Sequence, residues 1–163
     1  MTRRLTIRIA LLAALALSAP LAAQDRLAAD LAKYQHEVDP VHKARELAKL
    51  GDEQVELARK QSKAGDSEAS LHTLEQYRDE VSETVAALKG TGVNAERKPA
   101  GFKELQISLR ETVRHIDDLI LTLNVDQRPF FRVVRNDLST KHNELIDALF
   151  PLRTDHNAPK SDP

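Results

Sequence analysis

The chain has 163 residues, with 24 basic and 25 acidic side chains and no cysteine. This near balance of charge argues against non-specific nucleic-acid binding, which depends on net positive charge. The absence of cysteine excludes disulfide bonds, thiolate metal sites, c-type haem attachment and a lipid-modified cysteine in this sequence. We therefore expect a chain that is held together by core packing alone.

The first segment has the pattern of a secretory signal peptide. Three arginines and no acidic residue stand in the first eight positions, an apolar run covers residues 9–19, and small residues precede Gln24. A basic start, a short apolar stretch and a small-residue end are the parts of a cleaved signal, whereas a membrane span needs about 20 apolar residues. The sequence therefore predicts a signal peptide over residues 1–23, with an uncleaved anchor as the alternative.

Export has consequences for the rest of the chain. Removing the signal takes away three basic side chains and no acidic ones, so 21 basic and 25 acidic residues remain and the net charge is −4. We expect a periplasmic or secreted protein that is not integral to the membrane after processing and does not bind nucleic acid. The remaining 140 residues suffice for one domain with a substantial core.

Apolar residues recur at steps of three and four through most of the remaining chain, which predicts helices. A leading helix is expected over residues 24–39, with Leu27, Leu31, Tyr34 and Val38 on one face. The sequence leaves open whether this helix packs on the rest of the protein or extends away from it.

A first helical hairpin is expected over residues 40–89. Asp39 can cap its first helix and Pro40 suits the first helical turn. Gly65 suits the left-handed position that ends a helix, and Asp66 can cap the next helix directly. A turn this short between two long amphipathic helices makes them antiparallel neighbours.

A second hairpin is expected over residues 102–150, after an internal loop over residues 90–101 that is rich in glycine and proline. A short corner over residues 124–128 separates its two helices. The polar tail over residues 151–163 is predicted to be disordered.

The apolar stripes of the two hairpins can be buried by packing one hairpin on the other. The sequence therefore predicts an all-α fold, an antiparallel helical bundle of four or five helices built from two helical hairpins. A long coiled coil is less favoured, because apolar residues fill more than a narrow seam in the second hairpin. A homo-oligomer stays open, because the apolar face of the leading helix can pack internally or across a dimer.

One stretch, AGDSEASLHTLEQY over residues 64–77, resembles the turn and second helix of a tetratricopeptide repeat. The residues that agree in character with that pattern are Leu57, Ala58, Ser70 and Leu74. The chain departs from the pattern at Gln54, Gln61, Tyr77 and Ser82. The resemblance implies a helical hairpin. The mature chain as a whole is similar to the short, exported, all-helical proteins of bacteria, which implies a place in the cell envelope.

Two surfaces are candidates for binding a partner protein. The first is the groove of the first hairpin near Leu71, Leu74 and Tyr77. An amphipathic partner helix could pack there against an exposed apolar stripe.

The second candidate surface lies on the last helix and consists of Arg128, Phe130, Arg132 and Arg135. Its basic side chains suit an acidic partner or an anionic lipid headgroup, with an aromatic anchor beside them. The alternative is that Phe131 packs inward while the arginines form ion pairs with neighbours such as Asp126 and Asp137.

Catalytic and metal-binding patterns are weak in this sequence. It has no glycine-rich phosphate loop, no serine elbow and no histidine pair at the spacing of metal ligands on one helix. We therefore predict a non-enzymatic, exported binding or scaffold module without a cofactor, whose partner is a protein. One alternative is a bundle that holds a metal or small ligand between its helices, using His115 and His142. Another is peripheral attachment to anionic lipid through the last helix.

Overall fold

The computed structural model describes residues 19–151, with side chains from residue 27 onward. Five helices make up this part of the chain: α1 (Ala19–His36), α2 (Pro40–Lys63), α3 (Ser67–Gly90), α4 (Phe102–Thr122) and α5 (Arg128–Leu149). The described range contains no strand, so the all-α prediction is confirmed. Residue 19 already belongs to α1, five residues before the expected start of the leading helix. Most of the predicted signal peptide and the tail beyond residue 151 lie outside the described residues.

The ends of the helices follow from local chemistry. The Asp39 carboxylate accepts a hydrogen bond from the His42 backbone N–H at 2.8 Å, and Pro40 stands in the first turn of α2. The Asp66 carboxylate caps α3 in the same way, at 2.9 Å from the Ala69 nitrogen. Gly65 adopts a φ of 85°, in the left-handed region that favours glycine. These caps were expected from the sequence and are confirmed.

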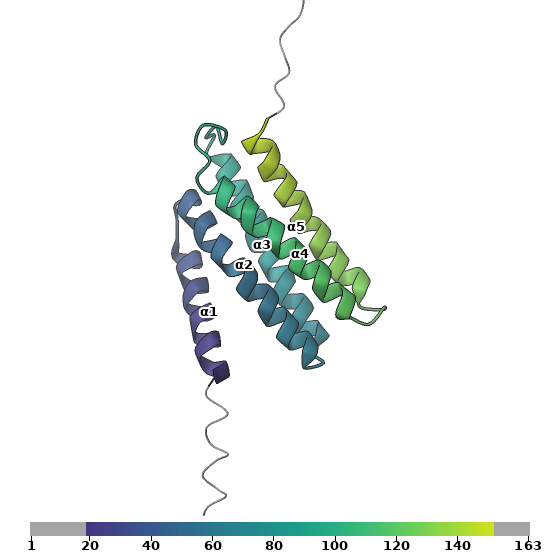
Figure 1. Ribbon diagram of the computed structural model, residues 1–163. Coiled ribbons are helices and arrows are strands. Elements are labelled where there is room, and N and C mark those ends of the chain that lie inside the picture. The colour runs from purple at the N-terminus through teal and green to yellow at the C-terminus, as the bar shows by residue number, and fades with distance from the viewer. Residues whose placement is uncertain (1–18, 152–163) are drawn as a thin grey trace, which may run out of the picture.

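The four helices α2 to α5 form a bundle in which α2 packs on α3 and α4, and α5 packs on the same two helices. Each hairpin is antiparallel, and α2 runs in the same direction as its neighbour α4 (Figure 1). Going around the bundle, the order is therefore α2, α3, α5, α4, which puts α3 and α4 at diagonal positions. Residues 91–101 connect these diagonal helices across one end of the bundle.

The connection over residues 91–101 also closes that end of the core. Ala95, which belongs to this connection, is buried and forms part of the core. Gly101 has a φ of 81°, and a Cβ atom there would lie 3.2 Å from the Val41 Cα and 3.1 Å from a Leu88 methyl group. Only glycine therefore suits the position at which this connection enters α4.

The helices α2 and α4 approach each other closely at Gly51, in the middle of α2. A Cβ atom on Gly51 would lie 2.6 Å from the Thr112 hydroxyl and 2.8 Å from the Tyr77 hydroxyl. Next to it, the Ser108 hydroxyl of α4 donates a hydrogen bond of 2.7 Å to the Ala48 carbonyl of α2. A glycine within a helix costs about 1 kcal/mol relative to alanine. Here that cost is offset by the close packing of two helices.

The leading helix α1 packs on the bundle through Tyr34, which is buried. The Tyr34 hydroxyl lies 3.0 Å from the Thr84 hydroxyl and donates to the Glu80 carbonyl at 3.2 Å, so α1 reaches α3 across α2. The Lys43 ammonium lies 4.9 Å from the centre of the Tyr34 ring. The burial of Tyr34 is the main reason that its pKa is raised. The structure thus answers the question that the sequence left open, because α1 packs on the bundle.

Replacing Gly51 tests the close approach of α2 and α4. Gly51→Val should lower the free energy of unfolding by about 1 to 3 kcal/mol, because the new methyl groups overlap the Thr112 and Tyr77 hydroxyls. Gly90→Ala is the matched control, since a Cβ atom there meets nothing within 4 Å. Urea denaturation of both variants measures the difference. A Gly51→Val variant as stable as the parent would contradict the packing described.

Replacing Tyr34 tests the attachment of α1. Tyr34→Ala should lower the free energy of opening of α1 by about 3 kcal/mol, because it removes a buried aromatic ring. Tyr34→Phe keeps the ring and should cost about 1 kcal/mol through the lost hydrogen bonds. Hydrogen exchange read by mass spectrometry should show lost protection in α1 and unchanged protection in α2 to α5. Full protection of α1 in Tyr34→Ala would show that other contacts hold it.

Candidate functional site: a groove between α2 and α4

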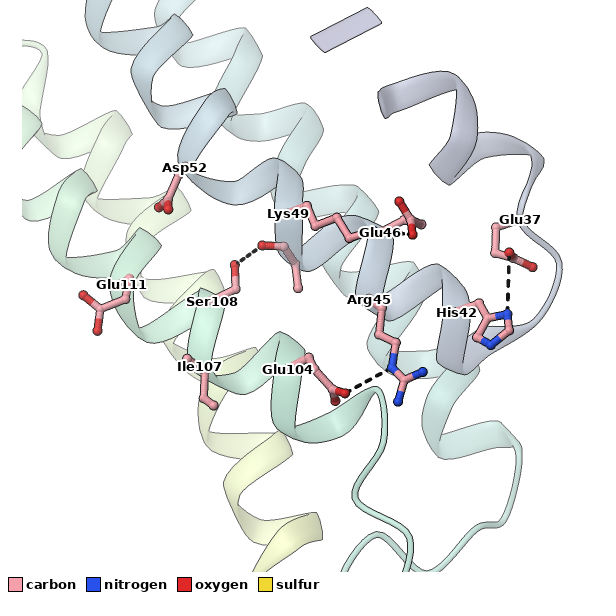
Figure 2. A pocket seen from close by; sticks show the side chains of 11 residues that line it. Glu37, His42, Arg45, Glu46, Lys49, Asp52, Glu104, Ile107, Ser108 and Glu111 are labelled. Atoms are coloured by element: carbon pink, nitrogen blue, oxygen red, sulfur yellow. Dashed lines mark hydrogen bonds and ion pairs between the residues drawn. The ribbon is translucent and has the colours of Figure 1, made fainter. Parts of the chain in front are cut away.

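A surface groove with a volume of about 760 Å³ lies between α2 and α4 and is open to solvent. Figure 2 shows its side chains, which come from the two helices and from the segment that precedes α2. They are Glu37, His42, Arg45, Glu46, Ala48, Lys49, Asp52, Glu104, Ile107, Ser108 and Glu111.

Three polar contacts join α2 to α4 along this groove. The Arg45 Nε atom lies 3.1 Å from a Glu104 carboxylate oxygen near the N-terminal ends of the two helices. Farther along, the Ser108 hydroxyl bonds to the backbone of α2. Beyond Gly51, the His115 Nδ1 atom lies 3.3 Å from a carboxylate oxygen of Asp52. These contacts join the two helices that line the groove.

The groove carries a negative charge above an apolar strip. Its lining has five acidic side chains and two basic ones, which is a net charge of −3 with His42 uncharged. Ala48 and Ile107 supply apolar surface, and Ile107 is 42% exposed. The Asp52 side chain, which pairs with His115, is 72% exposed, so its carboxylate is open to solvent. This combination suits an amphipathic cationic ligand.

The Glu104 carboxylate is held in place by two hydrogen bonds. It accepts a hydrogen bond from the Gly101 backbone N–H at 2.8 Å and one from Arg45. Partial burial raises its pKa, but hydrogen bonds from the backbone and from Arg45 outweigh burial and lower the pKa overall. A carboxylate that is held ionised in this way acts as an anchor for Arg45 and α4. It is poorly suited to donating a proton in catalysis.

The first predicted partner surface is part of the core. Leu74 and Tyr77 have no exposed surface, and Leu71 is partly buried against the core. Burial raises the pKa of Tyr77 to about 12, although the neighbouring hydroxyls of Thr112 and Ser108 lower it. Neither the Tyr77 nor the Thr112 hydroxyl makes a hydrogen bond of good geometry within the described part of the chain. These residues stabilise the bundle and leave only Leu71 for contact from outside.

Two of the three arginines of the second predicted surface, Arg128 and Arg135, make contacts within the bundle. Arg128 donates hydrogen bonds to the carbonyls of Leu123 and Leu121, so it satisfies the C-terminal end of α4. Arg135 forms a two-pronged ion pair with Asp117 of α4, at 2.9 and 3.0 Å, which raises the pKa of Arg135. Arg132 is exposed and makes no ion pair among the described residues.

The ion pairs of α5 differ from those that the sequence suggested. Phe131 is buried, as one alternative expected. Asp137 pairs with Arg78 of α3 at 3.7 Å and not with an arginine of its own helix. Arg135 pairs with Asp117 of α4.

The second predicted surface is also split by the geometry of the helix. Successive helical residues are about 100° apart, so Phe130 and Arg132 lie about 200° apart around α5. Phe130 stands two turns before Asp137 and therefore shares the flank that faces α3. The arginines lie on the flank toward α4. Phe130 is exposed but belongs to a different face from Arg132.

The two histidines of the metal alternative are not brought together. His115 contacts Asp52 of α2, whereas the His142 Nε2 atom lies 2.9 Å from the Gln106 side-chain nitrogen, on the side of α4 that faces α5. Among the described residues, no group of three or more histidine, aspartate and glutamate side chains has a geometry that could hold a metal ion.

Sequence reasoning did not single out the α2–α4 groove. The useful signal was Gly51 within a helical pattern, together with the small polar residues Ser108 and Thr112 on α4. A glycine in the interior of a helical pattern often marks a close approach of another segment. Which helix approaches it depends on the order of the helices around the bundle.

Comparison of the chain with protein-family models, curated proteins and solved structures gives no match.

Glu104 should make the stability of the protein depend on acid. Its folded-state pKa lies below the ordinary value of 4.5, so its stabilising contribution is present above that pH and is lost as the pH falls through the folded-state value. Glu104→Gln should be less stable than the parent at neutral pH and should lose less stability on acidification. Urea denaturation at neutral and acid pH measures this.

Glu75→Gln is the control for that experiment, because it removes a carboxylate of α3 outside the groove. If Glu75→Gln changed the acid dependence as much as Glu104→Gln, the contacts of Glu104 would not be its cause.

Proposed function

We propose that this chain is an exported, non-enzymatic helical module that binds a segment of another protein in the groove between α2 and α4. The observation that carries the proposal is the groove itself, which is open, lies between two helices running in the same direction (Figure 1) and has a formal net charge of −3 over its lining residues. Grooves between helices are a recurring site for amphipathic helices, which place apolar residues at the base and charges along the rims. The signal-like first segment supports export to the periplasm or beyond.

The chemistry of the groove restricts the partner. Ala48 and Ile107 are the apolar residues among the groove's lining, so its apolar strip is short. The acidic rims favour a partner segment with lysine or arginine on both sides of that ridge. Charges of this kind contribute more to the association rate and to the choice of partner than to affinity. We infer a basic amphipathic helix that binds reversibly.

A ligand held inside the bundle is a weaker alternative. The interior between the helices is filled by apolar side chains, and His115 and His142 each contact a neighbouring residue. Docking to anionic lipid through the arginines of α5 is weaker as well, because Arg128 and Arg135 are already bound to carbonyls and to a carboxylate.

Site-specific photo-crosslinking in cells tests the groove. A photoreactive amino acid at Ile107 should give a discrete crosslinked protein, whereas the same amino acid at the exposed Ala86 of α3 should not. Reversing two rim charges with Glu46→Lys and Glu111→Lys should lower the yield from position 107 by about tenfold, because both substitutions repel a basic segment. Mass spectrometry then identifies the crosslinked segment of the partner.

The proposal predicts two features of that result. The crosslinked segment must be basic and amphipathic, and the yield must fall with the charge reversals. Equal crosslinking yields from positions 107 and 86 would refute binding in the groove. A yield from position 107 that both charge reversals leave unchanged would refute it as well.

A further inference from the structure

A second hollow lies between α2 and α4, farther along the same two helices than the groove. This lower hollow has a volume of about 350 Å³, and its side chains come from the last two turns of each helix. They are Arg59, Ser62, Lys63, Asp118 and Thr122. All five are polar, whereas the groove also contains apolar side chains.

Helical periodicity places the lower hollow and the groove on one face of the bundle. Residues seven apart in an α-helix point in nearly the same direction, with a drift of about 20° per step. On α2, Arg59 of the lower hollow follows Asp52 and Arg45 of the groove at successive steps of seven. On α4, Asp118 follows Glu111 at the same step. The two hollows are therefore successive parts of one surface, which we call the α2–α4 face.

The charge of the α2–α4 face changes sign along its length. The groove has five acidic and two basic lining residues, whereas the lower hollow has two basic residues and one acidic residue. The formal net charge is therefore −3 in the groove and +1 in the lower hollow.

The charged side chains of the lower hollow are weakly engaged within the chain. Lys63 and Asp118 are exposed, and neither makes an ion pair with another described residue. Arg59 has a contact of 3.9 Å with Glu56, three residues earlier on the same helix. Basic groups in this state are open to acidic groups from outside.

The length of the α2–α4 face suits a helix of about five turns. Arg45 in the groove and Lys63 in the lower hollow are 18 residues apart on α2, which corresponds to a rise of about 27 Å. The chain itself provides an example of a helix laid on α2, because α1 packs along it and runs antiparallel to it (Figure 1).

The charges also select a direction for the bound helix. Basic side chains over the groove and acidic side chains over the lower hollow match the charges of the face. A helix is stabilised by acidic residues near its N-terminus and basic residues near its C-terminus, because they meet the opposite ends of its dipole. Both conditions are met together only when the helix runs antiparallel to α2 and α4.

We propose that the partner segment is a helix of about five turns that lies antiparallel to α2 and α4 along the whole face. Its N-terminal half is acidic and lies over the lower hollow, and its C-terminal half is basic and lies over the groove. The inference rests on the proposed function, since it assigns the charge order and the direction of the segment that the groove binds. A helix that is basic throughout would bring like charge to Arg59 and Lys63.

Titration with designed helical peptides of about 18 residues tests the charge order. The first peptide carries glutamates in its N-terminal half and lysines in its C-terminal half. The second has the same composition with the two charges mixed, and the third is basic throughout. Fluorescence anisotropy of labelled peptides should show that the processed protein binds the first about tenfold more tightly than the second. This measurement is made in solution, and none of the helices that the structure describes is long and apolar enough to cross a membrane.

Reversing the charge of the lower hollow tests where the acidic half lies. Arg59→Glu with Lys63→Glu should weaken binding of the first peptide by about tenfold and should not weaken binding of the third. The matched control is Lys98→Glu with Arg132→Glu, which changes the net charge equally at exposed residues that line neither hollow. This control should change binding by less than about twofold. Circular dichroism verifies that each variant is folded.

Spin labels test the direction of the bound helix. The sequence has no cysteine, so Lys103→Cys and Leu121→Cys each provide a single exposed labelling site near one end of α4. A label at the N-terminus of the first peptide should lie closer to position 121 than to position 103 by double electron–electron resonance. The opposite order of distances would show that the helix runs parallel to α2 and would overturn the proposed direction.

The peptide results separate this inference from the proposed function. Binding of the third peptide, together with equal affinities for the first and second, would leave the groove as a site for basic segments and refute the charge order. A first peptide that binds equally well after reversal of Arg59 and Lys63 would refute it too. Absence of binding by all three peptides would contradict the proposed function itself.

Discussion

The packing of α2 against α4 at Gly51 is the contact on which the rest of the architecture depends. Because Gly51 has no side chain, the hydroxyls of Thr112 and Tyr77 can occupy the space beside α2. The helices are then close enough for Ser108 to bond to the backbone of α2 and for Arg45 to reach Glu104. Ser108 and Ala48, which this approach brings into contact, also line the groove, so the packing of the helices and the candidate site share these residues.

Sharing these residues has a consequence for any binding partner. Ser108 and Ala48 are committed to packing, and changes there would alter stability and binding together. Residues at the sides of the groove, such as Glu46 and Glu111, are partly exposed and form surface ion pairs with Lys49 and Arg110, which contribute little to the stability of the fold. Specificity in this site therefore rests on the rims.

Local signals in the sequence determined most of the fold. Asp39, Gly65 and Asp66 mark helix ends because capping depends on neighbouring residues only. The order of the helices around the bundle depends on how a connection of eleven residues, 91–101, crosses its end, and no local pattern encodes that choice. The groove between α2 and α4 follows from this order, so it could not be predicted from periodicity.

The errors in the predicted surfaces have physical reasons too. Apolar periodicity identifies a buried stripe, and the same pattern was read as a binding groove at Leu74 and Tyr77, which lie in the core. On α5, the spacing of Arg128, Arg132 and Arg135 correctly placed them on one side. Phe130 was added to them by sequence proximity, although two residues along a helix are nearly opposite each other.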